Sequence, residues 1–173
     1  MIDAAPATTG GRADVQDDLD GALFAELYPK LRRFAAVVAP LDLDPDDLLQ
    51  EAVAQALRAG PLTWLDHPTA YLRRTMTNLA ANHNRSRGRA RRADLRLITE
   101  AASPATETYP SDLAELDRLA PDDRAVLFLA DVERLPLAEV AATLGIRPAA
   151  ARARASRARR RLRDALTDEG ATS

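Results

Sequence analysis

The sequence predicts an all-α fold: two small helical domains joined by a flexible acidic linker, the C-terminal one a four-helix domain with a helix-turn-helix motif. Two observations favour this class. Apolar residues make up 46% of the chain and aromatic residues only 4%, and the apolar residues are mostly alanine and leucine, which favour helices over strands. In several segments apolar residues also recur three and four positions apart, which is typical of amphipathic helices.

The N-terminal region predicts a leader followed by a first helix. Residues 1–18 mix alanine, threonine, glycine and acids without periodicity, and we expect them to be disordered. From Leu19 the helical spacing of apolar residues begins, and it lasts until Pro40. Pro29 lies inside this segment and is expected to kink or split the helix near Tyr28, because proline removes a backbone hydrogen bond.

A second helix is expected to begin after Asp44, which can cap it, with Pro45 in the first turn. Its buried side would comprise Leu48, Leu49, Ala52, Val53, Ala56 and Leu57. The opposite side carries Asp47, Gln50 and Glu51, which by spacing alone form an ordinary solvated acidic face. Gly60 ends the helix, and the loop that follows holds the only tryptophan, Trp64, which we expect by default to cover the core.

A long third helix is predicted from Pro68 onwards. Its inner side would comprise Tyr71, Leu72, Thr75, Met76, Leu79 and Ala80, and its outer side Arg73, Arg74, Thr77, Asn78, Ala81, Asn82 and Arg85. Arginine neutralises phosphate, and an asparagine amide can both donate to and accept from a base, so this outer face predicts nucleic-acid contacts. The alternative is a solvated polar face whose helix frays after Asn82.

The C-terminal segment predicts a helix, a tight turn at Gly145 and a second helix that begins at Pro148. One narrow side of the second helix is lined by Ala151, Ala155, Ala158, Leu162, Ala165 and Leu166, and the remaining surface by Arg152, Arg154, Arg157, Arg159, Arg160, Arg161 and Arg163. Such a helix can bury only its alanine side, so the arginines must face water or a polyanion. This favours a helix-turn-helix unit that inserts its second helix into the major groove, over a solvated basic helix or a coiled-coil strand.

These segments divide the chain into regions. We expect a first domain at residues 19–92, a linker at 93–111, a second domain at 112–166 and a tail at 167–173, with Ser111 capping a short helix ahead of the one that begins at Pro121. Fully extended, the roughly 19 linker residues reach at most about 65 Å. Two domains so tethered could engage separate sites on one DNA duplex.

Several classes of protein are disfavoured by composition. The chain contains no cysteine, which excludes disulfides, a thiolate nucleophile and cysteine-ligated zinc. His67 and His83 lack metal-ligand spacing, no glycine-rich phosphate loop is present, and we expect neither cofactor nor metal. A net charge of -2 hides basic clusters and separate acidic tracts, and dense basic clusters suggest nucleic acid. Without an apolar span or a signal sequence, a cytoplasmic protein that does not insert into membranes is expected.

The order of these parts is similar to a known family. An acidic DDLLQE helix, a loop containing WL, a YLRRTMTNLAANHNRSR helix, an acidic linker, and LDRLAPDDRAVL followed by the helix-turn-helix resemble the extracytoplasmic-function group of bacterial RNA polymerase sigma factors. The resemblance runs over residues 19–166. It implies a promoter-specificity subunit, not an enzyme, which binds core RNA polymerase, directs it to promoters and assists melting. A polymerase-independent helix-turn-helix regulator is the alternative.

The resemblance assigns roles residue by residue. It implies that Asp47, Gln50 and Glu51 bind the β′ clamp helices of the polymerase. It also implies that the chain contacts the β flap of that enzyme. Reading and melting of the downstream (-10) element falls to Trp64, Arg73, Arg74, Asn78, Asn82, His83 and Arg85. Reading of the upstream (-35) element falls to Arg147, Ala150, Arg152, Ala153, Arg154, Ser156 and Arg157. An anti-sigma factor is a further partner that the family allows. Promoter preference does not transfer, because alanines and Pro148 stand where the family has polar residues.

Overall fold

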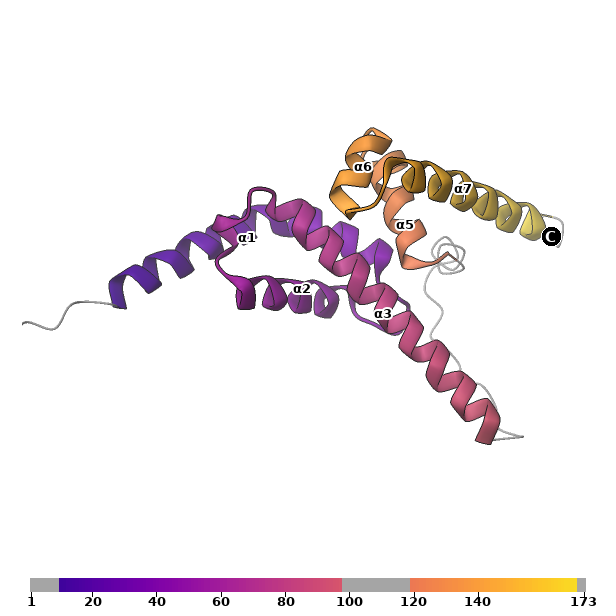
Figure 1. Ribbon diagram of the computed structural model, residues 1–173, viewed down its shortest axis with the longest axis horizontal. Coiled ribbons are helices and arrows are strands. Elements are labelled where there is room, and N and C mark those ends of the chain that lie inside the picture. The colour runs from indigo at the N-terminus through magenta and orange to yellow at the C-terminus, as the bar shows by residue number, and fades with distance from the viewer. Residues whose placement is uncertain (1–9, 98–118, 171–173) are drawn as a thin grey trace, which may run out of the picture.

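The computed structural model describes residues 10–97 and 119–170, and these residues form helices and turns without a strand, which confirms the all-α class. In chain order the elements are α1 (Gly10–Val38), α2 (Pro45–Ala59), the 3-10 turn η1 (Leu62–Trp64), α3 (Pro68–Leu97), α5 (Pro121–Leu127), the π-helical turn η2 (Phe128–Val132), α6 (Leu137–Leu144) and α7 (Pro148–Gly170). The N-terminal part of α1 and the C-terminal part of α3 project away from the bundle (Figure 1).

Helix α1 corrects two expectations. It begins at Gly10, so residues 10–18, predicted as part of a disordered leader, are helical, whereas residues 1–9 lie outside the described residues. It also continues through Pro29 without a break. Proline cannot donate to the carbonyl of Ala25, but both residues are exposed, so water can satisfy that carbonyl and the helix is not forced to split.

Helix α2 follows the local signals in the sequence. The carboxylate of Asp44 accepts a hydrogen bond from the Asp46 N–H at 2.7 Å, and Pro45 occupies the first turn. At the other end the Gly60 N–H donates to the Ala56 carbonyl. The predicted bounds are confirmed. They were predictable because residues close in sequence cap both ends of the helix.

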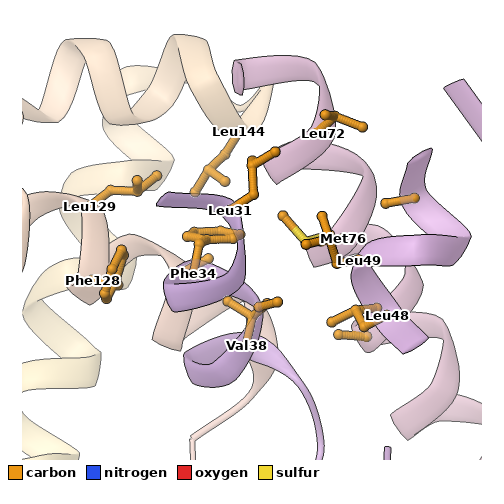
Figure 2. Close-up of a cluster of buried hydrophobic side chains, with 14 of the residues drawn as sticks. Leu31, Phe34, Val38, Leu48, Leu49, Leu72, Met76, Phe128, Leu129 and Leu144 are labelled. Carbon is orange, nitrogen blue, oxygen red and sulfur yellow. The ribbon is translucent and has the colours of Figure 1, made fainter. Parts of the chain in front are cut away.

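The core of the first domain is formed by α1, α2 and α3. It contains Leu31, Phe34, Val38, Leu48, Leu49, Leu72 and Met76, each of which is at most 2% exposed (Figure 2). Helix α3 continues to Leu97, beyond the predicted domain limit at residue 92. The rest of the linker and the helix expected after Ser111 lie outside the described residues.

In the C-terminal domain, α6, a turn and α7 form the predicted helix-turn-helix. Gly145 ends α6 with φ 65° and ψ 35°, the left-handed conformation that favours glycine. The alanine side of α7 is buried as expected, since Ala151, Ala155 and Ala158 have no exposed surface. The side chains of Ala165 and Leu166 lie outside the described residues.

The two domains pack against each other and share one hydrophobic core. Phe128 from η2 meets Phe34 from α1 edge to face, with ring centroids 5.7 Å apart, and Leu129 and Leu144 belong to the same cluster. Figure 2 shows Phe34 with Phe128 and Leu129 on one side and Met76 of α3 on the other. The C-terminal domain therefore covers part of the surface that the tether was expected to leave free.

Candidate nucleic-acid interface

The outer face of α3 forms one side of an open groove against α2. The groove has a volume of about 470 Å³, and its polar lining includes Arg74, Asn78, Asn82 and Arg85, together with Gln55 from α2 and Tyr71. The side chains of these first four residues are exposed, as predicted for DNA contacts. Such a groove offers guanidinium groups to phosphates, amides to base edges and one aromatic ring to a base face.

Two residues of this groove are not predicted as DNA contacts by the sequence. Helical spacing places Tyr71 on the inner side of α3, but it is 37% exposed. Gln55 belongs to α2, and only the packing of α2 against α3 brings it beside Asn78. Helical spacing ranks residues within one helix and carries no signal for a groove that two helices build together.

Arg73 contradicts its predicted place on the outer face. It is 6% exposed, its guanidinium lies 5.5 Å from the centroid of the Phe34 ring, and it forms an ion pair with Glu133 of the C-terminal domain. Thr77, one turn further on, is also buried, and its hydroxyl donates to the Arg73 carbonyl at 2.8 Å. Both residues lie on the side of α3 that the C-terminal domain covers.

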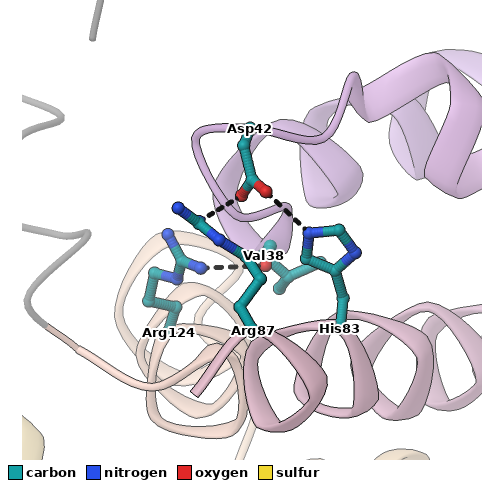
Figure 3. A network of polar contacts seen from close by, with 5 residues as sticks. All are labelled: Val38, Asp42, His83, Arg87 and Arg124. Carbon is teal, nitrogen blue, oxygen red and sulfur yellow. Dashed lines mark hydrogen bonds and ion pairs between the residues drawn. The ribbon is translucent and has the colours of Figure 1, made fainter. Parts of the chain in front are cut away.

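His83 is held at the C-terminal half of α3 by the loop before α2. Its Nε2 lies 2.8 Å from a carboxylate oxygen of Asp42, and Arg87 donates to the other oxygen (Figure 3). Burial raises the pKa of the Asp42 carboxyl, but the hydrogen bond from His83 and the charge of Arg87 outweigh it, so this pKa lies below its usual value. His83 therefore braces α3 against the α1–α2 loop in this conformation.

Trp64 does not cover the core. It is 74% exposed at the end of η1, which corrects the default expectation for a lone tryptophan. A Cβ placed on Gly60 would lie 3.5 Å from the Trp64 ring, so the ring extends over this glycine. An exposed ring of this size offers a face on which a planar group can stack.

The acidic face of α2 is accessible, as its periodicity predicted. Asp47, Gln50 and Glu51 are all exposed, and Glu51 accepts a hydrogen bond from Arg58 at 3.1 Å. Asp46, beside them, pairs with Arg32 of α1. The coulombic attraction of Asp46 raises the pKa of Arg32.

Helix α7 presents most of its predicted contacts to solvent. Exposed side chains belong to Arg147, Arg152, Ala153, Ser156 and Arg157, while Ala150 and Arg154 are half-buried. Acidic residues of α5 and η2 pair with Arg154 and with two further arginines of α7: Asp122 with Arg154 at 2.9 Å, Asp123 with Arg161 at 3.4 Å, and Asp131 with Arg159. The hydrogen bonds that Arg159 donates to the Asp131 carboxylate raise the pKa of Arg159. Burial of the alanine side of α7 sets the rotation of the helix about its axis, so that Arg152 and Arg157 face outwards, and the partly exposed ion pairs add little to this.

The two candidate DNA surfaces meet across a cleft between the domains. The cleft has a volume of about 220 Å³, and its lining includes Asn78 and Arg85 from α3 and Asp122 and Arg154 from the C-terminal domain. Beside it, the Arg74 guanidinium lies so close to Gly145 that a Cβ there would be 2.5 Å from the guanidinium carbon. In this conformation the two surfaces therefore lie side by side.

Residues 10–97 and 119–170 contain neither a metal-binding cluster nor a membrane-spanning helix. Over these ranges no group of three or more histidine, aspartate and glutamate residues is arranged to hold a metal ion. None of the helices in this part of the chain combines the length and the apolar character needed to cross a membrane.

Comparisons with known proteins assign both domains. Residues 23–90 match the model of Sigma-70 region 2, and residues 113–162 match that of Sigma-70, region 4. The chain is 35% identical over 133 residues to ECF RNA polymerase sigma factor SigE of Mycolicibacterium smegmatis, a match that covers 71% of this chain and 52% of that protein. A match to the probable ECF RNA polymerase sigma factor SigI of Mycobacterium tuberculosis is 28% identical and covers 69% of this chain and 46% of that protein.

The chain thus spans about half the length of these two relatives. Among solved structures, it resembles the sigma factor RpoE in its co-crystal with the anti-sigma factor NepR from Bartonella quintana. The TM-score is 0.61 at 23% identity, and the match covers 85% of this chain and 96% of that one. This likeness concerns the fold.

Proposed function

Because the chain belongs to the sigma-70 family, in its extracytoplasmic-function group, we propose that it is an alternative sigma factor. It binds core RNA polymerase, directs it to specific promoters and assists promoter melting. The observation that carries this proposal is the pairing of two arginine-bearing surfaces in one chain, on α3 within the region 2 match and on α7 within the region 4 match. The protein acts in the cytoplasm, where the polymerase is, and works as a regulator, not an enzyme.

The α3 groove and Trp64 would hold the nontemplate strand open. Unstacking a base costs a few kcal/mol, and stacking of one base on an aromatic side chain is worth about 1–3 kcal/mol. Arg74 and Arg85 add contacts to phosphates, and Asn78 and Asn82 supply amides for base edges. Binding energy of this size offsets unstacking, so melting needs no catalytic group.

Helix α7 would read the upstream element from the major groove, with α6 bracing it. Arg152 and Arg157 are the exposed cations on the outward face of its N-terminal half, where a recognition helix meets base edges and phosphates. The other contacts proposed are Arg147, Ala150, Ala153, Arg154 and Ser156. Arg154 would first have to leave Asp122.

The acidic face of α2, formed by Asp47, Gln50 and Glu51, would dock on the β′ clamp helices, and the C-terminal domain on the β flap. Exposed carboxylates on a rigid helix suit a basic protein surface and would repel DNA. An anti-sigma factor is a further proposed partner. It would act by covering one of these polymerase-facing surfaces.

Use of both DNA surfaces requires the two domains to separate. Arg73 can reach DNA only after it leaves Glu133, and the cleft between α3 and α7 must open for the domains to reach separate elements. We propose that polymerase binding supplies this energy, because a partner that contacts both domains in the open state shifts the equilibrium towards it.

The groove can be tested by separating DNA binding from DNA opening. Asn78→Ala in the full chain, assembled with core polymerase, should slow promoter opening more than it weakens closed-complex binding, measured by 2-aminopurine fluorescence and by gel shift. Asn84→Ala is the matched control, since Asn84 is an exposed asparagine of α3 outside the predicted contacts. Equal losses in opening and binding would overturn the role proposed for Asn78.

A further inference from the structure

The loop that carries Trp64 is held in place by a carboxylate from a distant helix. Asp20 of α1 is only 8% exposed. One of its oxygens accepts the Leu62 N–H at 3.1 Å, and the other accepts the Thr63 N–H at 3.0 Å and the Thr63 hydroxyl at 2.9 Å. Gln16, one turn earlier in α1, donates to Asp20 and to the Thr63 hydroxyl.

These bonds replace a cap that the loop lacks. The residue before η1 is Pro61, which makes no side-chain capping bond. The first N–H groups of a helical turn have no partner within the turn and need an acceptor from elsewhere. Asp20 provides it from 42 residues away, and Leu62, which is 1% exposed, anchors the same turn in the core.

Trp64 is the residue that this arrangement positions. Its own backbone N–H bonds only to Pro61 within the turn, its ring extends over Gly60, and its side chain is 74% exposed. A large apolar ring held in water by a rigid backbone is arranged for a partner outside the chain. Rigidity before binding lowers the entropy lost when that partner stacks.

We propose that Asp20, assisted by Gln16, is a positioning residue that holds the Trp64 ring ready to stack on an unpaired base of the melted strand. This inference rests on the proposed function. Asp20 touches no DNA itself and acts through the η1 backbone. Its removal leaves Trp64 in the chain but frees the loop that carries it.

The single tryptophan makes the loop directly observable, because emission excited at a wavelength that the three tyrosines do not absorb reports Trp64 alone. In Asp20→Ala, acrylamide quenching of this emission should rise and its anisotropy should fall. Asp18→Ala is the matched control, since Asp18 is an exposed acid on the same helix. Asp20→Asn, which keeps the size of the side chain, serves if the alanine variant does not fold. Unchanged quenching in a folded Asp20 variant overturns the inference.

A double-mutant cycle then tests the link to melting. With core polymerase, Trp64→Ala should slow promoter opening by about 5- to 150-fold, the range of one stacking contact. Asp20→Ala should slow it by no more than that, and the double variant should be no slower than Trp64→Ala. A double variant slower by the product of both factors would mean that Asp20 acts by another route, which overturns the inference. If Trp64→Ala alone leaves opening unchanged, the role proposed for Trp64 in melting fails, and the positioning inference, which depends on it, fails too.

Discussion

Replacing Glu133 with alanine should release the C-terminal domain from α1 and α3. Glu133 is the partner of Arg73, whose side chain is 7% exposed and whose Nε has no hydrogen-bond partner within the described residues. Without Glu133 the guanidinium stays buried against Phe34 with no charge opposite it, as long as the domains remain together. Opening returns Arg73 to water, so the substitution destabilises the closed conformation and leaves the open one unaffected.

The magnitude follows from the burial of the pair. Removing one partner of a fully buried ion pair costs about 3–5 kcal/mol, and a hydrogen bond to a charged group is worth about 1.5–3 kcal/mol. The Glu133 side chain is 24% exposed, and solvent therefore screens part of its attraction to Arg73. We expect a loss of about 2 kcal/mol, which raises the ratio of open to closed molecules about 30-fold.

Energy transfer between two dyes measures this ratio. The chain has no cysteine, so cysteines introduced at the exposed positions Glu26 in α1 and Ala138 in α6 take the dyes specifically. Single-molecule histograms over a urea series count both populations. Asp131→Ala is the matched control, because Asp131 lies in the same turn and pairs with Arg159 of its own domain.

If Glu133→Ala shifts the open population no more than Asp131→Ala does, the Arg73–Glu133 pair does not hold the domains together. A charge reversal adds a second check. Arg73→Glu combined with Glu133→Arg should restore part of the closed population that either single change loses, since the pair is reformed with opposite polarity.

Three further predictions concern single residues. Burial raises the pKa of the Asp20 carboxyl, but the hydrogen bonds from Thr63, Leu62 and Gln16 outweigh it and hold this pKa below its usual value. The ionised Asp20 carboxylate therefore stabilises the loop fully above about pH 4, the pKa of this group in the unfolded chain. This stabilisation is lost as the pH falls through the pKa of Asp20 in the folded protein. Tryptophan quenching should rise over that window in the wild type and stay flat in Asp20→Asn; a flat wild-type profile would contradict this. Arg152→Ala should relax upstream-element specificity by about 1–3 kcal/mol in a binding competition if it contacts a base edge, whereas a uniform loss would make it a phosphate contact. Gly145→Ala should lower the free energy of unfolding in urea by about 1–2 kcal/mol, because of its positive φ and because the new Cβ displaces the Arg74 guanidinium. Gly21→Ala, where a Cβ meets nothing within 4 Å, should cause no loss.

Features set by neighbouring residues were predictable from the sequence. The start of α2 follows from Asp44 and Pro45, and the turn before α7 follows from Gly145 and Pro148. The buried alanine side of α7 follows from periodicity alone. In each case the interaction that decides the conformation lies within a few positions, where spacing rules apply.

Features set by distant residues were not predictable. Arg73 reads as a solvated cation until Glu133, 60 residues away, is brought beside it. Nothing near Asp20 in the sequence marks it as a cap, because the N–H groups that donate to it belong to η1, 42 and 43 residues away. Pro29 predicted a break, but whether a helix tolerates proline depends on the exposure of the carbonyl four residues earlier, which tertiary packing decides.

The central claim is that this chain directs core RNA polymerase to promoters through two DNA-reading domains. The most direct measurement is to purify the full chain with core polymerase and sequence the transcripts that the complex makes from a promoter library. We expect a stable complex with a defined set of start sites, absent from core polymerase alone. A chain that does not bind core polymerase, or that binds it without selecting any start site, would rule out the proposed function.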